Sequence, residues 1–187
     1  MANLIQGFKQ AFFIKKEAGF NQPADVAAAD GVMLTEMKIE PNQTFSENES
    51  HVGTASPQGA GIKGAFEGAF TISGYLQVAS SGTASDLGPG LKALFEASFG
   101  QETDSAGTLT YSSTDENPMT LTLVKAAGSD YFTKASGCVV ESLEIEIVGN
   151  EKPSFRLTGP FGDHQIVGSF ISRLLPVLIF LIYLNFK

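Results

Sequence analysis

Apolar and polar residues alternate along several short segments of the chain, a pattern typical of strands that bury one face. Residues 65–78 show it most clearly, because apolar side chains and two glycines, Gly68 and Gly74, share one face while polar side chains occupy the other. The apolar side chains are those of Phe66, Phe70, Ile72, Leu76 and Val78. Glycine on an apolar face leaves space for a neighbouring ring or backbone, and it lets the strand bend as in a barrel.

Other segments with strand patterns follow at short spacing, with turn residues between them. They are residues 8–16, 31–40, 107–114, 119–126, 129–135, 138–149 and 152–159. In the segment 138–149 the apolar and acidic side chains alternate, so this strand is expected to bury one face and to show water a row of carboxylates. The apolar residues are Leu143, Ile145 and Ile147, and the acidic ones are Glu144 and Glu146.

The period changes to that of a helix between residues 87 and 99. One stripe carries Leu91, Leu94, Phe95, Ala97 and Phe99. Asp86 upstream is a candidate cap, and Gly100 stands just past the expected end. The sequence therefore predicts a mainly β protein, an antiparallel two-sheet sandwich or barrel with one short flanking helix.

Residues 41–64 lack apolar periodicity and contain Pro41, Pro57 and four glycines, which predicts a long loop. Loops longer than about 12 to 15 residues are uncommon in compact domains and are usually functional or disordered. This segment is therefore expected to contact something outside its own domain.

Composition and charge limit the function classes. The chain has 187 residues and a net charge of -8, so a nucleic acid backbone is repelled on average and tight nucleic acid binding is not expected. Cys138 is the one cysteine of the sequence, which excludes an intramolecular disulfide and a cysteine-based zinc site built from this chain alone. The first residues lack the pattern of a secretory signal, so we expect synthesis in the cytoplasm.

The sequence shows no catalytic, cofactor or metal site. His51 and His164 have no partner at ligand spacing and are interpreted as solvated loop residues, and Cys138 as a small buried apolar side chain. Glu144 and Glu146 lie two residues apart on a strand, which places both on one exposed face without the differing environments that acid–base catalysis needs. We therefore expect no enzyme.

The order of these segments resembles the tail tube (major tail) protein of long-tailed bacteriophages. The resemblance runs from about Phe8 to Gly168, and its most specific parts are the strand, helix and glycine order at 65–100 and the strand "GCVVESLEIE". It implies a two-sheet sandwich with a flanking helix, in six-fold or pseudo-six-fold rings that stack into a hollow cylinder. The implied partners are further copies of the chain and other phage tail proteins, and the implied location is the virion, with DNA passing through the lumen unbound.

The resemblance also implies roles for particular residues. Assembly contacts are expected between Thr44 and Lys63, at Thr44, Phe45, Glu49 and Lys63. A sheet facing the lumen is expected to hold Glu141, Glu144 and Glu146. Charge agrees with this independently, since a bore lined with carboxylates repels phosphates and lets DNA slide.

The last residues, 169–187, differ abruptly in composition from residues 1–168, which form the expected domain. The apolar run from Leu174 to Leu184 has 11 residues and includes a proline, short of the about 20 that a spanning helix needs. Three interpretations remain open: a membrane anchor, a final core strand or assembly segment, and a tail unrelated to the fold, as after a disrupted reading frame. The abrupt change favours the third, and the first carries the alternative function of a membrane-tethered β-sandwich binding domain.

Overall fold

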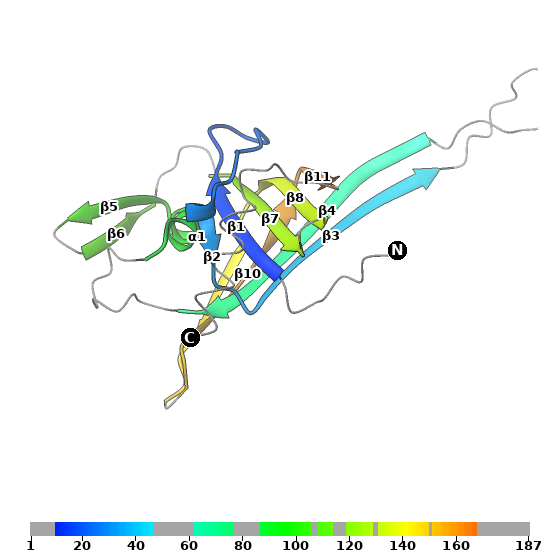
Figure 1. The fold of residues 1–187 in the computed structure, drawn as a ribbon. Coiled ribbons are helices and arrows are strands. Elements are labelled where there is room, and N and C mark those ends of the chain that lie inside the picture. Colours follow the sequence, from blue (N-terminus) through cyan, green and yellow to red (C-terminus); the bar gives the residue numbers. More distant parts are fainter. Residues whose placement is uncertain are drawn as a thin grey trace, which may run out of the picture.

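The computed structural model describes residues 10–46, 62–76, 87–105, 108–113, 119–128, 131–149 and 151–167. These residues form antiparallel strands, one short 3-10 helix and one α-helix (Figure 1). In chain order the elements are β1 (Gln10–Lys16), η1 (Ala28–Asp30), β2 (Gly31–Val32), β3 (Glu36–Ser46), β4 (Ile62–Tyr75), α1 (Pro89–Phe99), β5 (Gln101–Ser105), β6 (Thr108–Ser112), β7 (Leu121–Ala127), β8 (Tyr131–Cys138), β9 (Ser142–Glu146), β10 (Ser154–Phe161) and β11 (Asp163–Val167).

Two sheets make up the body of the fold. The five-stranded sheet has the order β11-β8-β7-β1-β2, the four-stranded sheet has the order β3-β4-β10-β9, and β5 and β6 form a separate two-stranded sheet. Every strand pair is antiparallel. This arrangement confirms the expected antiparallel two-sheet sandwich with one flanking helix.

The main core lies between the two large sheets and unites apolar residues of both. Its fully buried members include Ile14, Leu121 and Leu123 of the five-stranded sheet and Met37, Phe70, Ile72 and Leu157 of the four-stranded sheet. Burying a side chain of this size stabilises the fold by about 1.5–3 kcal/mol. The alternation seen in the sequence thus identifies the inner faces correctly.

Gly68 and Gly74 of β4 lie on the buried face, and aromatic rings of β10 fill the space above them. A Cβ atom at Gly68 would lie 2.5 Å from the Phe161 ring, and one at Gly74 would lie 2.8 Å from the Phe155 ring. Phe66 adds an edge-on contact to Phe161, with ring centroids 5.6 Å apart. The expectation that neighbouring rings use the gaps left by these glycines is confirmed.

Helix α1 closes one side of this core. Leu91 and Leu94 are buried in it, and the ring of Phe95 lies 6.3 Å from that of Phe155 on β10. The helix starts after Gly88, its N-cap residue, with Pro89 at its first turn and no side-chain hydrogen bond from the cap residue. Asp86, the candidate cap, lies outside the described residues. The predicted end of the helix is confirmed, because Gly100 has φ 107°, a conformation that glycine adopts at little cost.

Two predicted strands are divided in the structure. Residues 31–40 were expected to form one strand, but Gly31 and Val32 pair with β1 in one sheet, whereas β3 begins at Glu36 in the other. The segment 138–149 divides as well, because Cys138 ends β8 and β9 begins only at Ser142. In both places the chain crosses between the sheets, and alternation within a strand carries no information about sheet membership.

The predicted loop 41–64 is also shorter than expected. β3 continues to Ser46 and β4 starts at Ile62, and Figure 1 shows the two strands extending together away from the body. We call residues 41–46 and 62–67 the arm. Pro41 is compatible with this position because β3 is an edge strand, where a missing N–H leaves no ladder bond unmade. The remainder of the predicted loop, residues 47–61, lies outside the described residues.

Replacing Gly159 by alanine should destabilise the protein. Gly159 lies on β10 where the chain approaches β9, and a Cβ atom there would overlap the backbone carbonyl oxygen of Val139. We expect Gly159→Ala to lower the free energy of unfolding by about 1–3 kcal/mol, measured by urea denaturation. The control is Gly149→Ala, because a Cβ at Gly149 meets no atom within 4 Å. Equal stability of the two variants would contradict the close approach.

Candidate functional site

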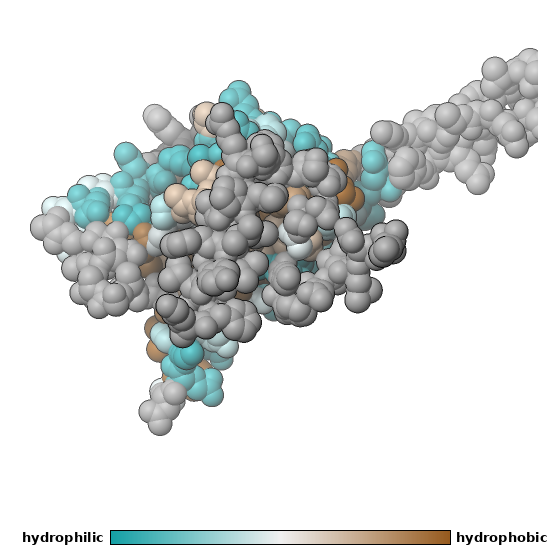
Figure 2. All heavy atoms as spheres, viewed as in Figure 1, coloured by the Kyte–Doolittle hydropathy of each residue, from teal (hydrophilic) through white to brown (hydrophobic). Residues whose placement is uncertain are grey.

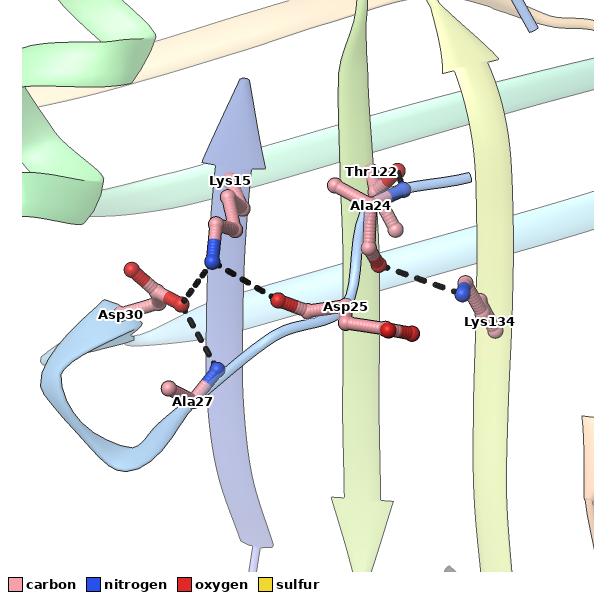
Figure 3. Close-up of polar contacts among 7 residues, drawn as sticks. All are labelled: Lys15, Ala24, Asp25, Ala27, Asp30, Thr122 and Lys134. Atoms are coloured by element: carbon pink, nitrogen blue, oxygen red, sulfur yellow. Dashed lines mark hydrogen bonds and ion pairs between the residues drawn. The ribbon is translucent and has the colours of Figure 1, made fainter. Parts of the chain in front are cut away.

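The outer face of the five-stranded sheet is covered by the chain itself. Residues 18–30, which we call the strap, are bonded to Lys15 of β1, Thr122 of β7 and Lys134 of β8 (Figure 3). Val26 of the strap is buried against a second apolar cluster. The sheet residues of this cluster are Phe13, Val124, Ala126 and Phe132.

Polar contacts hold the strap at its two ends (Figure 3). Lys15 Nζ donates to the carbonyl oxygen of Asp25 at 2.8 Å and lies 3.4 Å from Asp30 Oδ2. Asp30 Oδ2 also accepts a hydrogen bond of 2.7 Å from Ala27 N. Since Lys15 belongs to β1, these bonds fix the last turn of the strap to the sheet.

The other end of the strap is fixed through Thr122 of β7. Thr122 Oγ1 accepts a hydrogen bond of 2.9 Å from Ala24 N and donates one of 2.7 Å to Glu17 Oε1. Glu17, whose exposed fraction is 6%, also accepts a bond of 2.9 Å from Gly137 N, and Lys134 Nζ donates to Ala24 O at 3.2 Å. The strap therefore packs against the part of this sheet face that contains Phe13, Val124 and Thr122.

Replacing Thr122 by the isosteric valine should loosen the strap. The change leaves the Ala24 N–H without its acceptor and Glu17 Oε1 without one donor, while the side-chain volume stays the same. We expect Thr122→Val to cost about 1–3 kcal/mol of unfolding free energy in urea denaturation. Thr103→Val, at an exposed position of β5, should change it by less than about 0.5 kcal/mol. A Thr122 variant as stable as this control would show that the strap does not depend on the Thr122 hydroxyl.

The outer face of the four-stranded sheet, in contrast, is open and acidic. Period-two alternation and the strand register place one set of charged, exposed side chains on it. Among the described residues these are Glu36, Lys38, Glu40, Glu67, Glu144, Glu146 and Arg156. We call this set the acidic face, since five carboxylates stand against two cations. Figure 2 shows the molecule from the side of the five-stranded sheet, so the acidic face points away from the viewer, and both hydrophilic and hydrophobic residues are seen at the base of the arm.

Lys38 is already paired within the acidic face. Its ammonium lies 2.7 Å from Glu40 Oε1, with more than half of both side chains exposed. The hydrogen bond and charge of Glu40 raise the pKa of Lys38, with a smaller contribution from Glu36. Lys38 therefore stays charged and keeps further N–H donors available.

The three glutamates predicted to face a lumen are separated by the structure. Glu144 and Glu146 lie on the acidic face as part of β9, whereas Glu141 precedes that strand and is held by a bond of 2.9 Å from its N–H to Thr158 O. All three side chains are exposed. Glu36, Glu40 and Glu67 also lie on the acidic face but were not predicted to face a lumen. The alternation of residues 36–42 indicates the position of Glu36 and Glu40.

In the described chain no strand pairs with the outer sides of the four-stranded sheet, although Lys125 Nζ donates a hydrogen bond of 3.0 Å to Met37 O at one of them. β3 and β9 are its outer strands, and because all three ladders are antiparallel they run in opposite directions. The expectation that the apolar face of the 138–149 segment is buried is wrong beyond Leu143: Ile145 is 43% exposed and Ile147 is 75% exposed. Ile145 lies on β9, an edge strand whose outer side no strand of the described chain covers, and Ile147 lies beyond the end of β9.

Thr44, Phe45, Glu49 and Lys63 were predicted as assembly residues. Thr44 and Phe45 belong to β3, and Phe45 pairs with Lys63 of β4 in the arm. Glu49 lies outside the described residues. Their predicted role remains a prediction.

The structure describes one of the two histidines that were considered as possible metal ligands. His164 belongs to β11 rather than to a loop, and partial burial lowers its pKa while Asp163 acts in the opposite direction. His51 lies outside the described residues. Within the described ranges, no three His, Cys, Asp or Glu side chains are placed to hold a metal ion.

Membrane insertion was one interpretation of the end of the chain. Of the helices in the described ranges, none has the length and apolar character to cross a membrane. Residues 169–187 lie outside those ranges.

Cys138 should be unreactive in the folded protein. Its side chain is fully buried, and burial raises the pKa of the thiol, with a further increase from the charge of Glu17. At pH 8 the reactive thiolate is therefore scarcely populated, and we expect labelling by a maleimide to be at least about a hundredfold slower than in urea. Mass spectrometry of timed reactions measures this. Labelling at equal rates in the two conditions would contradict the buried position.

Comparisons with known proteins give structural matches. No family model matches the chain, and no curated protein matches it. The chain is similar to a chain in the cryo-EM structure of the anti-feeding prophage baseplate, with 8% identity and a TM-score of 0.52, covering 91% of this chain and 100% of that one. It also matches the SPP1 tail tube (10% identity, TM-score 0.47, 94% and 86% covered) and the sheath–tube complex of the extracellular contractile injection system PVC (9%, 0.44, 84% and 88%). The similarity to the baseplate chain shows a shared fold, which confirms the fold implied by the sequence resemblance.

Proposed function

We propose that this chain is a structural subunit that assembles with copies of itself into stacked rings, forming a tail tube that conducts DNA. The observation that carries the proposal is the four-stranded sheet, whose outer face is acidic and whose outer strands β3 and β9 pair with no further strand in the described part of the chain. In this proposal residues 1–168 form the assembling domain, and residues 169–187 are not required.

Edge geometry supports ring formation. An unpaired edge strand exposes N–H and C=O groups that a further strand can satisfy. Because β3 and β9 run in opposite directions, β9 of one copy joined to β3 of the next continues the antiparallel alternation without interruption. Repeating this contact is a heterologous association that generates a closed ring when its rotation closes.

The charge of the four-stranded sheet supports an orientation in which its outer, acidic face lines the central channel of the ring. The strap covers the outer face of the five-stranded sheet, so in a ring the acidic face is the one left open to a central channel. Its carboxylates, Glu144 and Glu146 among them, repel a phosphate backbone, and DNA passes through without being held. Residues such as Arg156 reduce this repulsion without reversing it, since carboxylates outnumber cations.

The arm supports contacts beyond one subunit. It extends away from the body (Figure 1) and includes Thr44, Phe45 and Lys63. In the sequence, Glu49 lies between its two strands. We propose that the arm contacts a neighbouring subunit or ring. The baseplate structure that shares the fold is described as six-fold symmetrised, which is compatible with six copies in a ring. The proposed role is that of a virion component without enzymatic activity, made in the cytoplasm of a bacterial host and bound to other tail proteins.

Assembly of the purified full-length chain tests the proposal. We expect rings or tubes of constant diameter in electron microscopy, and sedimentation velocity should show a species much heavier than 19.8 kDa whose share increases with concentration. A folded chain that remains a monomer at about 100 µM, well above ordinary dissociation constants for specific interfaces, would overturn it.

A further inference from the structure

The backbone of the four-stranded sheet shows which residues face its free edges. Bonded pairs alternate along an antiparallel ladder, so every second residue of a strand directs its N–H and C=O toward the same neighbour. Glu141 N donates to Thr158 O, and Thr35 N donates to Ser73 O, each at 2.9 Å. Thr158 therefore bonds toward β9 and Ser73 bonds toward β3.

This alternation extends to the outer strands through the register. Ser142 pairs with Thr158 and Lys38 pairs with Thr71, the residue two before Ser73. The even-numbered residues of β9 and β3 thus bond within the sheet, and the odd-numbered ones face outward. The outward residues are Leu143 and Ile145 on β9, and Met37, Ile39 and Pro41 on β3. The place of Pro41 agrees with this, because proline has no N–H to donate and is tolerated on an outward position.

We propose that β9 of one copy pairs with β3 of the next in a single register, with Leu143 opposite Ile39, Glu144 opposite Lys38 and Ile145 opposite Met37. This inference rests on the proposed ring and specifies the contact that closes it. Leu143 with Ile39 and Ile145 with Met37 are bonded pairs in this register. Met37 O already accepts a bond of 3.0 Å from Lys125 Nζ, and its second lone pair accepts the bond from Ile145 N. Glu144 with Lys38 is a non-bonded pair, whose side chains approach most closely.

Apolar and charged side chains both fit this register. Ile145, 43% exposed in the single chain, joins the apolar inner row that contains the buried Met37. Lys38 and Glu144 are both exposed on the acidic face, so they meet without either being buried. Glu146 lies opposite Glu36 at the end of β9, where water screens the two like charges.

Registers shifted by two residues fit less well. One shift sets Pro41 opposite Leu143, which removes a ladder bond; it pairs Glu144 with Glu40 and Glu146 with Lys38, so the lost bond and not the charge pairs disfavours it. The other sets Glu144 opposite Glu36 and the apolar Ile145 opposite Thr35. Shifts by one residue place apolar side chains on the acidic face.

Cysteine pairs test the register in the full-length chain. Opposite residues of a non-bonded pair have Cα atoms about 4.5 Å apart, within the range of a disulfide. The variant with Lys38→Cys and Glu144→Cys should form a ladder of covalent oligomers on mild oxidation, visible by non-reducing electrophoresis and abolished by a thiol reductant. Cys138 stays in every variant because it is buried.

The matched controls are Glu40→Cys with Glu144→Cys and Glu36→Cys with Glu144→Cys, which represent the two shifted registers. We expect the Lys38 pair to cross-link on the order of tenfold faster than either control, since only that pair meets the distance limit. Faster cross-linking of a control pair would overturn the register but leave the ring intact. Failure of the unmodified chain to form rings would instead overturn the proposed function.

Charge exchange provides a second test that needs no new cysteine. Lys38→Glu should raise the concentration needed for assembly about two- to fivefold, because it sets two carboxylates opposite each other. Adding Glu144→Lys should restore assembly, although the pairing of residue 38 with Glu40 stays lost. Both side chains are exposed, so circular dichroism should show an unchanged fold. No restoration in the double variant would contradict the pairing.

Discussion

The backbone of an antiparallel sheet must satisfy its outermost N–H and C=O groups, and the two sheets of this protein meet that requirement in different ways. In the five-stranded sheet the outer strand β2 has only two residues, next to helix α1, so little edge remains on that side. In the four-stranded sheet the outer strand β3 has 11 residues, and in the described chain no strand pairs with its outer side, where Lys125 Nζ donates a hydrogen bond of 3.0 Å to Met37 O. This long edge is the one that the proposed assembly uses, since a strand of a second copy can pair with it.

The outer faces of the two sheets also differ, because the strap packs on one and charged side chains are exposed on the other. The strap packs on the five-stranded sheet through an apolar cluster around Phe13 and Val26 and through polar bonds at Thr122 and Lys15. The four-stranded sheet has no such cover in the described chain and carries charged side chains instead. In the proposed ring this difference decides which sheet faces the channel, because only the four-stranded sheet carries an exposed set of charged side chains.

Three glycines allow the close packing that places β10 and β9 in the four-stranded sheet. Gly68 and Gly74 admit the rings of Phe161 and Phe155, which anchor β10 beneath β4. Gly159 admits the carbonyl of Val139 at the crossing from β8 to β9. The chain can therefore leave the five-stranded sheet and place β9 at the edge of the other sheet, where Glu144 becomes available to a neighbour.

The sequence by itself determined the strands with one apolar face, the single amphipathic helix with its glycine end, and the acidic character of the β9 strand, because side-chain alternation and local turn chemistry express these directly. The tertiary structure decided which sheet each strand joins, as at Val32 and Glu36, and it decided that Ile145 stays exposed although Leu143 packs against the core. It also turned most of Pro41 to Ser46 from an expected loop into strand. These outcomes depend on contacts between residues far apart in the chain, and alternation has the same period in an edge strand as in a central one.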